Sequence, residues 1–485
     1  IGYRVLESSK VMQIDLQPPM KITRITQNGI EQKFEQDGNA WFVKLTAQQK
    51  KGELKYVLVE YGGKPHASRR PPWDGGVNWG KDLEGRPLIT TSNQGIGGSI
   101  WWPGKDHPYD EPDSVLISIT VPDPLINVSN GRLRNVDYHS DKTSTYNWFV
   151  SNPINNYGVN INIGNYIHFG DVYKGEKGDL DCDYWVLDYH LEKAKETFKQ
   201  AHLMLEAFEH WFGPYPFYED SYKLVEVAYP GMEHQSSVTY GNGFTNGYGG
   251  RDVSSTGYGM KFDFIIIHES GHEWFANSIT NWDEADMWIH ESFIAYSENL
   301  FVDYFWGKEA SAAYCRGTRL NLDNDRPIVG VYGVNYNGSH DMYSKGANML
   351  HILRQLIDDD EKWRQILRGL GSEFYHQTVK SEQIEHYISK KSGIDLQLFF
   401  DQYLRDTRIP TFEYALINGE MQYRWTNCVK GFNMKVKVYV NDQMHWLEPT
   451  LKWQKLNLDE PIRLVNVDQD FYVATFKLTE ITAQK

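Results

Sequence analysis

The chain has 485 residues, of which 40% are hydrophobic and 14% aromatic, and its formal net charge is −15. This composition excludes a disordered chain and predicts roughly two to four domains, because a single core rarely exceeds about 250 to 300 residues. The acidic balance, without basic clusters, excludes nucleic acid as a partner, and no apolar run is long enough for a membrane span. Three scattered cysteines, Cys182, Cys315 and Cys428, predict core positions rather than disulfides.

The first part of the chain, residues 1–186, is predicted to be a β domain. Alternating apolar and polar residues at 115–121 are bounded by Asp and Pro, which is typical of a strand. Residues 62–87 are rich in Gly, Pro and charge, and they predict a long surface loop.

The pattern changes to helical near Asp188. Apolar residues recur at helical spacing over 189–211 and again over 342–403, with a short strand at 223–228 and a Gly-rich stretch at 241–259 between them. These features predict a mixed second domain over residues 187–408.

Strand-like alternation returns beyond Pro410, most clearly at residues 434–440. The tail, residues 409–485, is predicted to be a small β-sandwich. The fold class is therefore α+β with several domains.

The motif that narrows function most is His268-Glu269-Ser270-Gly271-His272, followed after eighteen residues by Glu291. Two histidines four apart on a helix share one face, so both imidazoles can bind one tetrahedral zinc, and a second helix can supply Glu291. Three protein ligands leave one position for water, which is typical of catalytic zinc. The motif interrupts an apolar run, which predicts a buried helix. Gly271 inside that helix predicts that another group approaches the backbone closely.

With this motif in view, the chain resembles the zinc metallo-aminopeptidase (gluzincin) family that includes aminopeptidase N and leukotriene hydrolase. The resemblance covers nearly the whole chain, and its landmarks occur in the family's order. They are the segment 94–112 with Trp101-Trp102-Pro103, Trp211-Phe212-Gly213-Pro214-Tyr215-Pro216, the Met-Glu segment at 230–234, the zinc string, Trp288-Ile289-His290-Glu291-Ser292-Phe293, and Tyr343-Ser344-Lys345-Gly346-Ala347. The family fold implies an N-terminal β domain, a thermolysin-like zinc peptidase domain and the β-sandwich.

The resemblance implies the catalytic roles. A single zinc ion per chain would be held by His268, His272 and Glu291. Glu269 would act as general base on a zinc-activated water and pass the proton to the leaving amine, and the hydroxyl of Tyr343 would stabilise the oxyanion.

The resemblance also implies the substrate-binding residues. Glu233 matches the glutamate that binds the substrate's N-terminal ammonium, Gln94 matches a glutamine at the same end, and Gly231 and Met232 complete the motif. From its spacing, seven residues after Glu291 on the same helical face, Glu298 is predicted to orient a ligand histidine. His290 points elsewhere on the helix and is interpreted as structural.

The sequence departs from the family pattern in four places. Pro230 and His234 replace a glycine and an asparagine of the Gly-Ala-Met-Glu-Asn motif, Ser292 replaces the glycine after the third ligand, and Gly104 replaces a cysteine. None of these changes removes a catalytic group. Their expected effect is on substrate register and side-chain preference, since proline lacks a backbone donor.

Two further expectations concern the ends of the chain. It is expected to start one or two strands into the family's N-terminal domain and to stop before the helical domain that covers the site in many members, so peptides of many lengths are expected as substrates. The start without methionine favours an extracytoplasmic location. The Gly-rich stretch at 241–259 is interpreted as a surface loop, with a lid as the alternative.

The leading hypothesis is a zinc aminopeptidase, a hydrolase that acts on peptides with an unblocked N-terminus. The alternatives are a zinc endopeptidase or tripeptide-releasing enzyme, which differs in whether it requires a substrate amine, and a non-catalytic scaffold of the same fold. The retention of ligands, base and oxyanion donor together argues against the scaffold.

Overall fold

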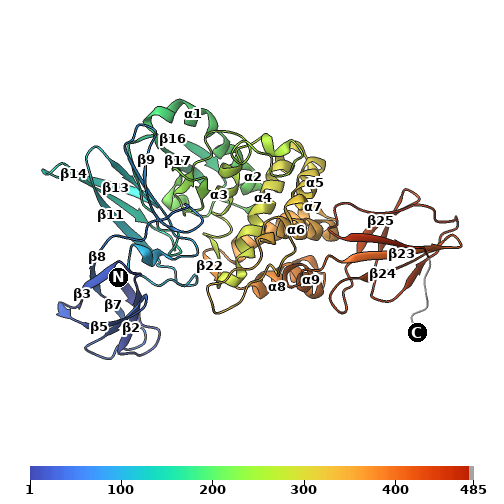
Figure 1. Cartoon of the computed structure of the whole chain (residues 1–485), viewed down its shortest axis with the longest axis horizontal. Helices are drawn as coiled ribbons and strands as arrows, with labels where there is room; N and C mark the ends of the chain where they lie inside the picture. The colour runs from blue at the N-terminus through green and yellow to red at the C-terminus, as the bar shows by residue number, and fades with distance from the viewer. Residues whose placement is uncertain (480–485) are drawn as a thin grey trace. The chain divides into compact units, whose positions relative to one another are not determined.

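The computed structural model describes residues 1–479 and combines many strands with a group of helices (Figure 1), which confirms the predicted α+β class. The chain groups into two compact units, and the predicted boundaries at 186 and 408 stay predictions. The first unit comprises Ile1–Lys174, Asp179–Glu196 and Phe217–Phe244, and the second comprises Gly175–Gly178, Thr197–Pro216 and the chain from Thr245 onward.

The first unit begins with three small antiparallel sheets around one apolar core. Ile14, Ile25 and Val43 are among its buried side chains. Along residues 40–44 the buried Trp41 and Val43 alternate with more exposed positions, as the strand period of two requires. The sheets are β1 (Gly2–Arg4) with β7 (Leu54–Tyr56), β2 (Val11–Asp15) with β6 (Ala40–Lys44) and β5 (Lys33–Asp37), and β3 (Lys21–Gln27) with β4 (Ile30–Glu31) and β8 (Leu58–Gly62).

A second core in the same unit lies around Trp148 and Val128, and two further sheets contribute to it. The predicted loop over 62–87 is wrong at its end, because residues 76–81 form a strand. Val77 is buried there. The backbone N–H and C=O groups of this strand are paired by hydrogen bonds with the antiparallel strand over residues 87–92. One sheet has the strand order β12 (Ile126–Val128), β15 (Asn162–Gly164), β10 (Pro87–Ser92), β9 (Gly76–Lys81). The other has the order β11 (Val115–Pro122), β14 (Thr143–Val150), β13 (Arg132–Tyr138).

A five-stranded mixed sheet completes the first unit and carries part of the predicted substrate site at its edge. The strand predicted at 223–228 is β18, which is buried along its whole length and pairs in parallel with both of its neighbours. The sheet has the order β16 (Tyr166–Gly175), β17 (Gly178–Leu187), β18 (Tyr222–Glu226), β20 (Val238–Tyr240), β19 (Gly231–Met232).

The second unit is built on helices around the zinc motif. The segment predicted as one helix at 189–211 forms two helices, α1 (Leu191–Thr197), most of which belongs to the first unit, and α2 (Gln200–Phe212) of the second. Helix α3 (Phe264–Gly271) carries the motif and packs against α2 and α4 (Trp288–Trp306). The remaining helices are α5 (Lys308–Gly317), α6 (Ser344–Ile357), α7 (Asp360–Glu373), α8 (Ser381–Ser392) and α9 (Gln397–Arg405), with β21 (Ile279–Asn281) parallel to β22 (Gln377–Val379).

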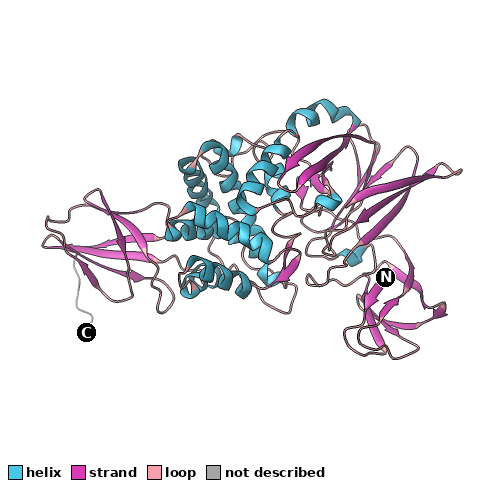
Figure 2. Ribbon diagram, turned by 180° about the vertical axis from the view of Figure 1, so that it is seen from behind, coloured by secondary structure: helices cyan, strands magenta, loops and turns pink. Residues whose placement is uncertain are grey.

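The C-terminal part of the second unit consists of two sheets (Figure 2). Buried residues alternate along β24 and β25, so each sheet turns one face inward, as predicted for a sandwich. The predicted strand at 434–440 is β25. One sheet has the strand order β27 (Gln454–Leu456), β24 (Glu420–Thr426), β23 (Thr411–Ile417), β29 (Ala474–Leu478). The other has the order β26 (Gln443–Leu447), β25 (Val436–Val440), β28 (Val465–Val467).

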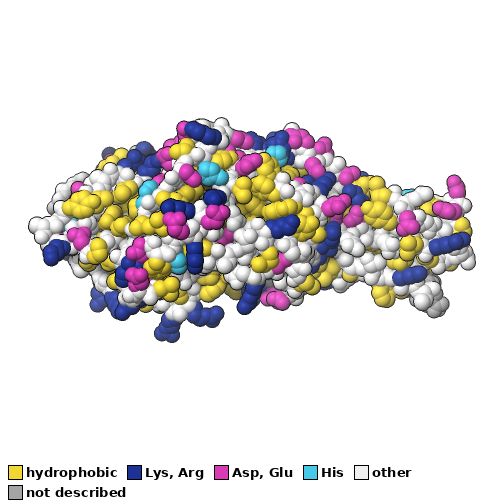
Figure 3. Space-filling view, turned by 90° about the horizontal axis from the view of Figure 1, so that it is seen from above, with side chains coloured by type: hydrophobic (Ala, Val, Ile, Leu, Met, Phe, Trp, Pro, Cys, Tyr) yellow, Lys and Arg dark blue, Asp and Glu magenta, His cyan; other side chains and the backbone are white. Residues whose placement is uncertain are grey.

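Three further features concern the apolar character of the helices, the distribution of surface charge and the cysteines. No helix within residues 1–479 combines the length and apolar character that crossing a bilayer requires. Acidic and basic side chains are interspersed on the face in Figure 3. The three cysteines are unpaired and buried, as predicted.

Candidate functional site

The predicted zinc ligands come from two adjacent helices of the second unit. Helix α3 begins after Asp263, whose carboxylate accepts hydrogen bonds from the backbone N–H groups of Ile265 at 3.1 Å and Ile266 at 3.4 Å. His268 lies in the last turn of α3 and His272 caps its C-terminal end, so both rings project from one side. Glu291 lies in the first turn of α4. All three ligand side chains are buried, as the apolar surroundings of the motif predict.

The ligand atoms lie at separations that suit one zinc ion. Oε2 of Glu291 is 3.8 Å from Nε2 of His268 and 3.5 Å from Nε2 of His272. In a tetrahedral site with zinc-to-ligand distances of about 2.1 Å, donor atoms are about 3.4 Å apart. The observed separations are therefore close to those of a formed site.

The other nitrogen of each histidine is fixed by an acceptor. Nδ1 of His268 donates to Oε1 of Glu298 at 2.8 Å, and Nδ1 of His272 donates to the carbonyl oxygen of Phe275 at 3.1 Å. Because these partners only accept, each Nδ1 carries hydrogen, which leaves Nε2, the ring atom nearer Glu291, as the atom that can bind a metal. The structure thus brings Glu298 to the ligand histidine that sequence spacing suggested.

The charges at these atoms fit a dication. Burial lowers the pKa of His272 to about 4, so its imidazole is neutral near pH 7. Burial alone raises the pKa of Glu291, but the interactions with the neighbouring His272 and His268 rings outweigh this effect and bring it to about 2. Oε2 of Glu291 is buried with no hydrogen-bond partner among the described residues. A buried, ionised, unpartnered oxygen beside imidazole nitrogens is a site for a metal ion.

Glu269, the predicted base, is buried on the same helix between the two ligand histidines in sequence. Burial raises the pKa of its carboxyl group to about 7, and the nearby His268 opposes this rise. A bound dication would act in the same direction as His268. The carboxyl group is thus in an environment suited to proton transfer near neutral pH.

Gly271 is explained by the packing of three helices. A Cβ atom at this position would lie 3.0 Å from Oγ of Ser297 and 3.2 Å from both Cδ1 of Ile294 and Cε2 of Phe208. The close approach predicted from a glycine within the motif is confirmed. His290, interpreted as structural, accepts a hydrogen bond from the backbone N–H of Asn281 at 2.9 Å through Nε2.

Tyr343 lies next to the predicted ligands, at the start of α6. Its ring is nearly parallel to the ring of His268, with an angle of 22° and a centroid distance of 6.0 Å. The hydroxyl of Ser292 donates to the carbonyl oxygen of Met342 at 2.6 Å and so ties α4 to the residue before Tyr343. Gly346 is required there, because a Cβ atom would lie 1.9 Å from Oγ of Ser292. The departure at Ser292 therefore adds a contact that supports the position of Tyr343.

The predicted amine-binding residues form a hydrogen-bonded cluster within the first unit. Gln94 donates through Nε2 to Oε1 of Glu233 at 2.7 Å, although 138 residues lie between them in the sequence. The hydroxyl of Tyr157 donates to the same oxygen at 3.1 Å. Sequence reasoning missed Tyr157, because a lone tyrosine in a loop carries no local signal.

The two predicted backbone contributors, Gly231 and Met232, form the edge strand β19. Pro230 precedes this strand, and its carbonyl oxygen accepts from the backbone N–H of Gly241 at 2.8 Å. His234 follows Glu233 and is fully buried, and burial lowers its pKa to about 3, so the ring is neutral. The replacements at 230 and 234 are therefore accommodated without adding a charge to the cluster.

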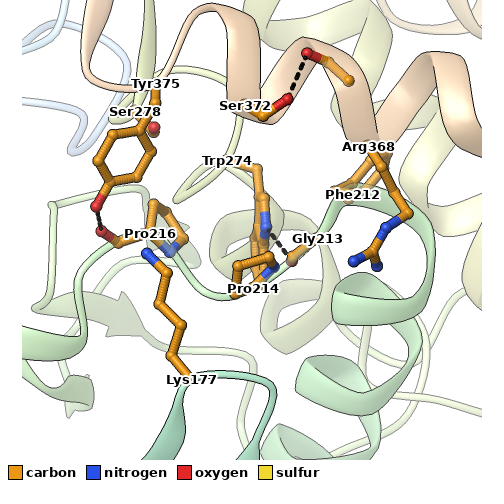
Figure 4. Close-up of a pocket in the computed structure, with 12 residues that line it drawn as sticks. Lys177, Phe212, Gly213, Pro214, Pro216, Trp274, Ser278, Arg368, Ser372 and Tyr375 are labelled. Carbon is orange, nitrogen blue, oxygen red and sulfur yellow. Dashed lines mark hydrogen bonds between the residues drawn. The ribbon is translucent and has the colours of Figure 1, made fainter.

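A cavity of about 460 Å³ lies elsewhere in the second unit, beside the turn at residues 213–216. Trp274 lies between Tyr375 on one side and Arg368 on the other (Figure 4). Trp274 donates to the carbonyl oxygen of Gly213 at 2.9 Å, which fixes its ring. Among the described residues that line the cavity there is none of the predicted ligands or catalytic residues.

The sequence is similar to those of known peptidases. Residues 196–403 match the peptidase family M1 domain. The chain is 24% identical over 351 residues to probable aminopeptidase 2 of Sulfurisphaera tokodaii, covering 68% of this chain and 43% of that protein. It is 22% identical over 333 residues to aminopeptidase B of Rattus norvegicus, covering 64% of this chain and 48% of that protein. The chain thus spans less than half the length of these relatives.

Solved structures share the fold. A two-domain M1 zinc metallopeptidase bound to L-tryptophan superposes with a TM-score of 0.68 at 19% identity, over 80% of this chain and 85% of the other. An M1 zinc metallopeptidase of Deinococcus radiodurans bound to the substrate Tyr-Ser-Ala gives a TM-score of 0.67 at 19% identity, over 83% of this chain and 88% of the other.

Proposed function

We propose that this chain, whose residues 196–403 match the peptidase family M1 domain, is a zinc-dependent aminopeptidase that releases the N-terminal residue of peptides. The relatives named aminopeptidase support the reaction class. Its substrates are peptides with an unblocked N-terminus, in line with the Tyr-Ser-Ala bound to the structural neighbour.

The observation that carries this proposal is the donor set of two imidazole nitrogens and one carboxylate. His268, His272 and Glu291 would hold the zinc ion, and their Nε2 and Oε2 atoms converge at 3.5 and 3.8 Å. Three protein ligands leave a further position for water and substrate. Zinc, when bound, supplies a Lewis acid that polarises a carbonyl group and lowers the pKa of water.

Glu269 is proposed as the general base and acid. Its carboxylate takes the proton of the attacking water and then gives it to the nitrogen of the scissile bond, so the carbon–nitrogen bond breaks as an amine leaves. The hydroxyl of Tyr343 is proposed to donate to the oxyanion that forms on the carbonyl oxygen. Donors of this kind contribute about 3 to 4 kcal/mol.

Glu233 is proposed to bind the N-terminal ammonium, with Gln94 supporting it and the backbone of Gly231 and Met232 beside it. A carboxylate that accepts from an ammonium forms a charge-assisted bond, which is stronger than a neutral one. Binding the terminal amine fixes register, so only the first peptide bond reaches the reacting groups.

The experiment compares one peptide with an unmodified and with an acetylated N-terminus, each with and without a zinc chelator. Chelator-sensitive cleavage of the unmodified peptide alone is the expected result. Equal cleavage of both peptides would favour an endopeptidase and contradict the role of Glu233. The absence of cleavage in both would favour a non-catalytic scaffold.

A further inference from the structure

The carboxylate of Glu298 is held at both of its oxygens. Oε1 accepts from Nδ1 of His268 at 2.8 Å, and Oε2 accepts from the hydroxyl of Tyr314 at 2.6 Å. Glu298 lies on α4 and Tyr314 lies on the next helix, α5. Both side chains are buried, so water is not available to replace either contact. The three residues form one chain of hydrogen bonds that ends at a predicted zinc ligand.

The hydroxyl of Tyr314 can act only as the donor in this contact, because the acceptor is a carboxylate. Burial, together with the charge of Glu298, raises the pKa of Tyr314 well above its usual value, so the hydroxyl keeps its proton. A phenylalanine would fill nearly the same volume but would leave Oε2 of Glu298 buried and unpaired. The tyrosine is therefore needed for its oxygen rather than for its ring.

The ring of Tyr314 is held in place by its surroundings. It packs against Phe262, just before α3, with a centroid distance of 6.1 Å. The same helix is held two residues later, where Arg316 forms an ion pair with Asp470 of the C-terminal sheets. The hydroxyl is thus presented from a fixed position, and it restrains the rotation of the Glu298 carboxylate.

We propose that Tyr314 is a positioning residue for the zinc centre, which orients His268 through Glu298 and thereby tightens zinc binding. This inference rests on the proposed role of His268 as a zinc ligand. Groups that orient a ligand histidine contribute about 10- to 100-fold to metal affinity, and a residue one bond further away is expected to contribute about 3- to 10-fold.

The test measures the apparent Kd for zinc by competition with a chromogenic chelator. Tyr314→Phe is expected to weaken zinc binding by about 3- to 10-fold and Glu298→Ala by about 10- to 100-fold. The matched control is Tyr296→Phe, because Tyr296 is also fully buried and its hydroxyl accepts from Nε1 of Trp363 at 3.1 Å. The control is expected to leave the Kd unchanged.

A double-mutant cycle separates positioning from a general loss of stability. If Tyr314 acts through Glu298, Tyr314→Phe has no further effect on the zinc Kd when Glu298 is already alanine. The Tm of each metal-free variant shows whether the fold is retained.

Three results would overturn the inference. If Tyr314→Phe binds zinc with the Kd of the wild type while Glu298→Ala binds weakly, Tyr314 has no positioning role, although Glu298 does. Additive effects of Tyr314→Phe and Glu298→Ala would exclude the route through Glu298. The absence of zinc binding by the wild-type chain would overturn both this inference and the proposed function.

Discussion

The proposed zinc centre and the proposed amine-binding cluster are built in opposite ways. The proposed zinc ligands come from 24 consecutive residues, His268 to Glu291, on two helices that follow each other in the chain. The amine-binding cluster joins Gln94, Tyr157 and Glu233, which come from three distant segments of the first unit. Local helix geometry therefore fixes the first site, whereas the tertiary fold fixes the second.

This difference predicts how each site responds to change. In the zinc centre, each residue has a separate chemical task, so removing one group stops the reaction or the metal binding. In the cluster, two neutral donors share one oxygen of Glu233, so the loss of one donor leaves the other in place. We expect the largest effects in the zinc centre and graded effects in the cluster.

The largest expected effect is that of Glu269→Gln. The amide keeps the shape of the side chain but cannot accept the proton of the attacking water, so kcat should fall by about 1,000-fold. Zinc content should not change, because no ligand is altered. The control is Glu385→Gln, a buried carboxylate of α8 that pairs with Arg405 at 2.6 Å, which should leave kcat nearly unchanged. A Glu269→Gln enzyme within tenfold of the wild type would contradict the assignment.

The next effect is that of Glu233→Gln, measured as kcat/KM on peptides with an unmodified N-terminus. Losing the charge should lower kcat/KM by about 10- to 100-fold, because hydrogen bonds to charged groups contribute about 1.5 to 3 kcal/mol. Glu226→Gln is the control, since Glu226 is a buried carboxylate of the same unit that contacts His190 at 2.6 Å. Equal losses in the two variants would indicate a structural effect instead.

Gly271→Ala tests the packing behind the zinc motif. Helix propensity alone predicts a gain of about 1 kcal/mol from this change. The contacts at 3.0 and 3.2 Å instead predict overpacking, and the free energy of unfolding should decrease by about 1 to 3 kcal/mol. Denaturant unfolding decides between the two signs. Adding Ser297→Ala removes Oγ, the nearest obstacle, without placing a glycine in α4, and should recover part of the loss.

The smallest expected effect is that of Tyr157→Phe. Gln94 still donates to Glu233 in this variant, so kcat/KM should fall only about 3- to 10-fold, mainly through KM. Tyr166→Phe is a matched control, because its buried hydroxyl donates to the carbonyl oxygen of Glu226 at 2.8 Å in the same unit. A loss as large as that of Glu233→Gln would show that the two donors are not equivalent. It would contradict the graded effects expected for the cluster.

The same contrast explains what could be predicted from sequence. Spacing alone brought His268, His272, Glu291 and Glu298 together, because a helix repeats every 3.6 residues and local geometry carries the information. Spacing could not bring Gln94 to Glu233, and only the family resemblance paired them.

The remaining differences have physical causes as well. Residues 76–81 were expected in a loop because glycines mark turns, yet pairing with β10 makes them a strand. Tyr157 and Tyr314 carry no local signal, since a buried tyrosine that packs as an apolar residue looks the same in sequence as one that donates a hydrogen bond. Only the tertiary structure distinguishes the two.

The most direct test titrates zinc into the metal-free chain and follows release of the N-terminal residue from an unmodified peptide. We expect activity to rise linearly and to saturate at a single zinc ion per chain, and Glu291→Ala to abolish this response. Activity that does not depend on zinc, or a Glu291→Ala variant that responds like the wild type, would contradict the proposed zinc centre.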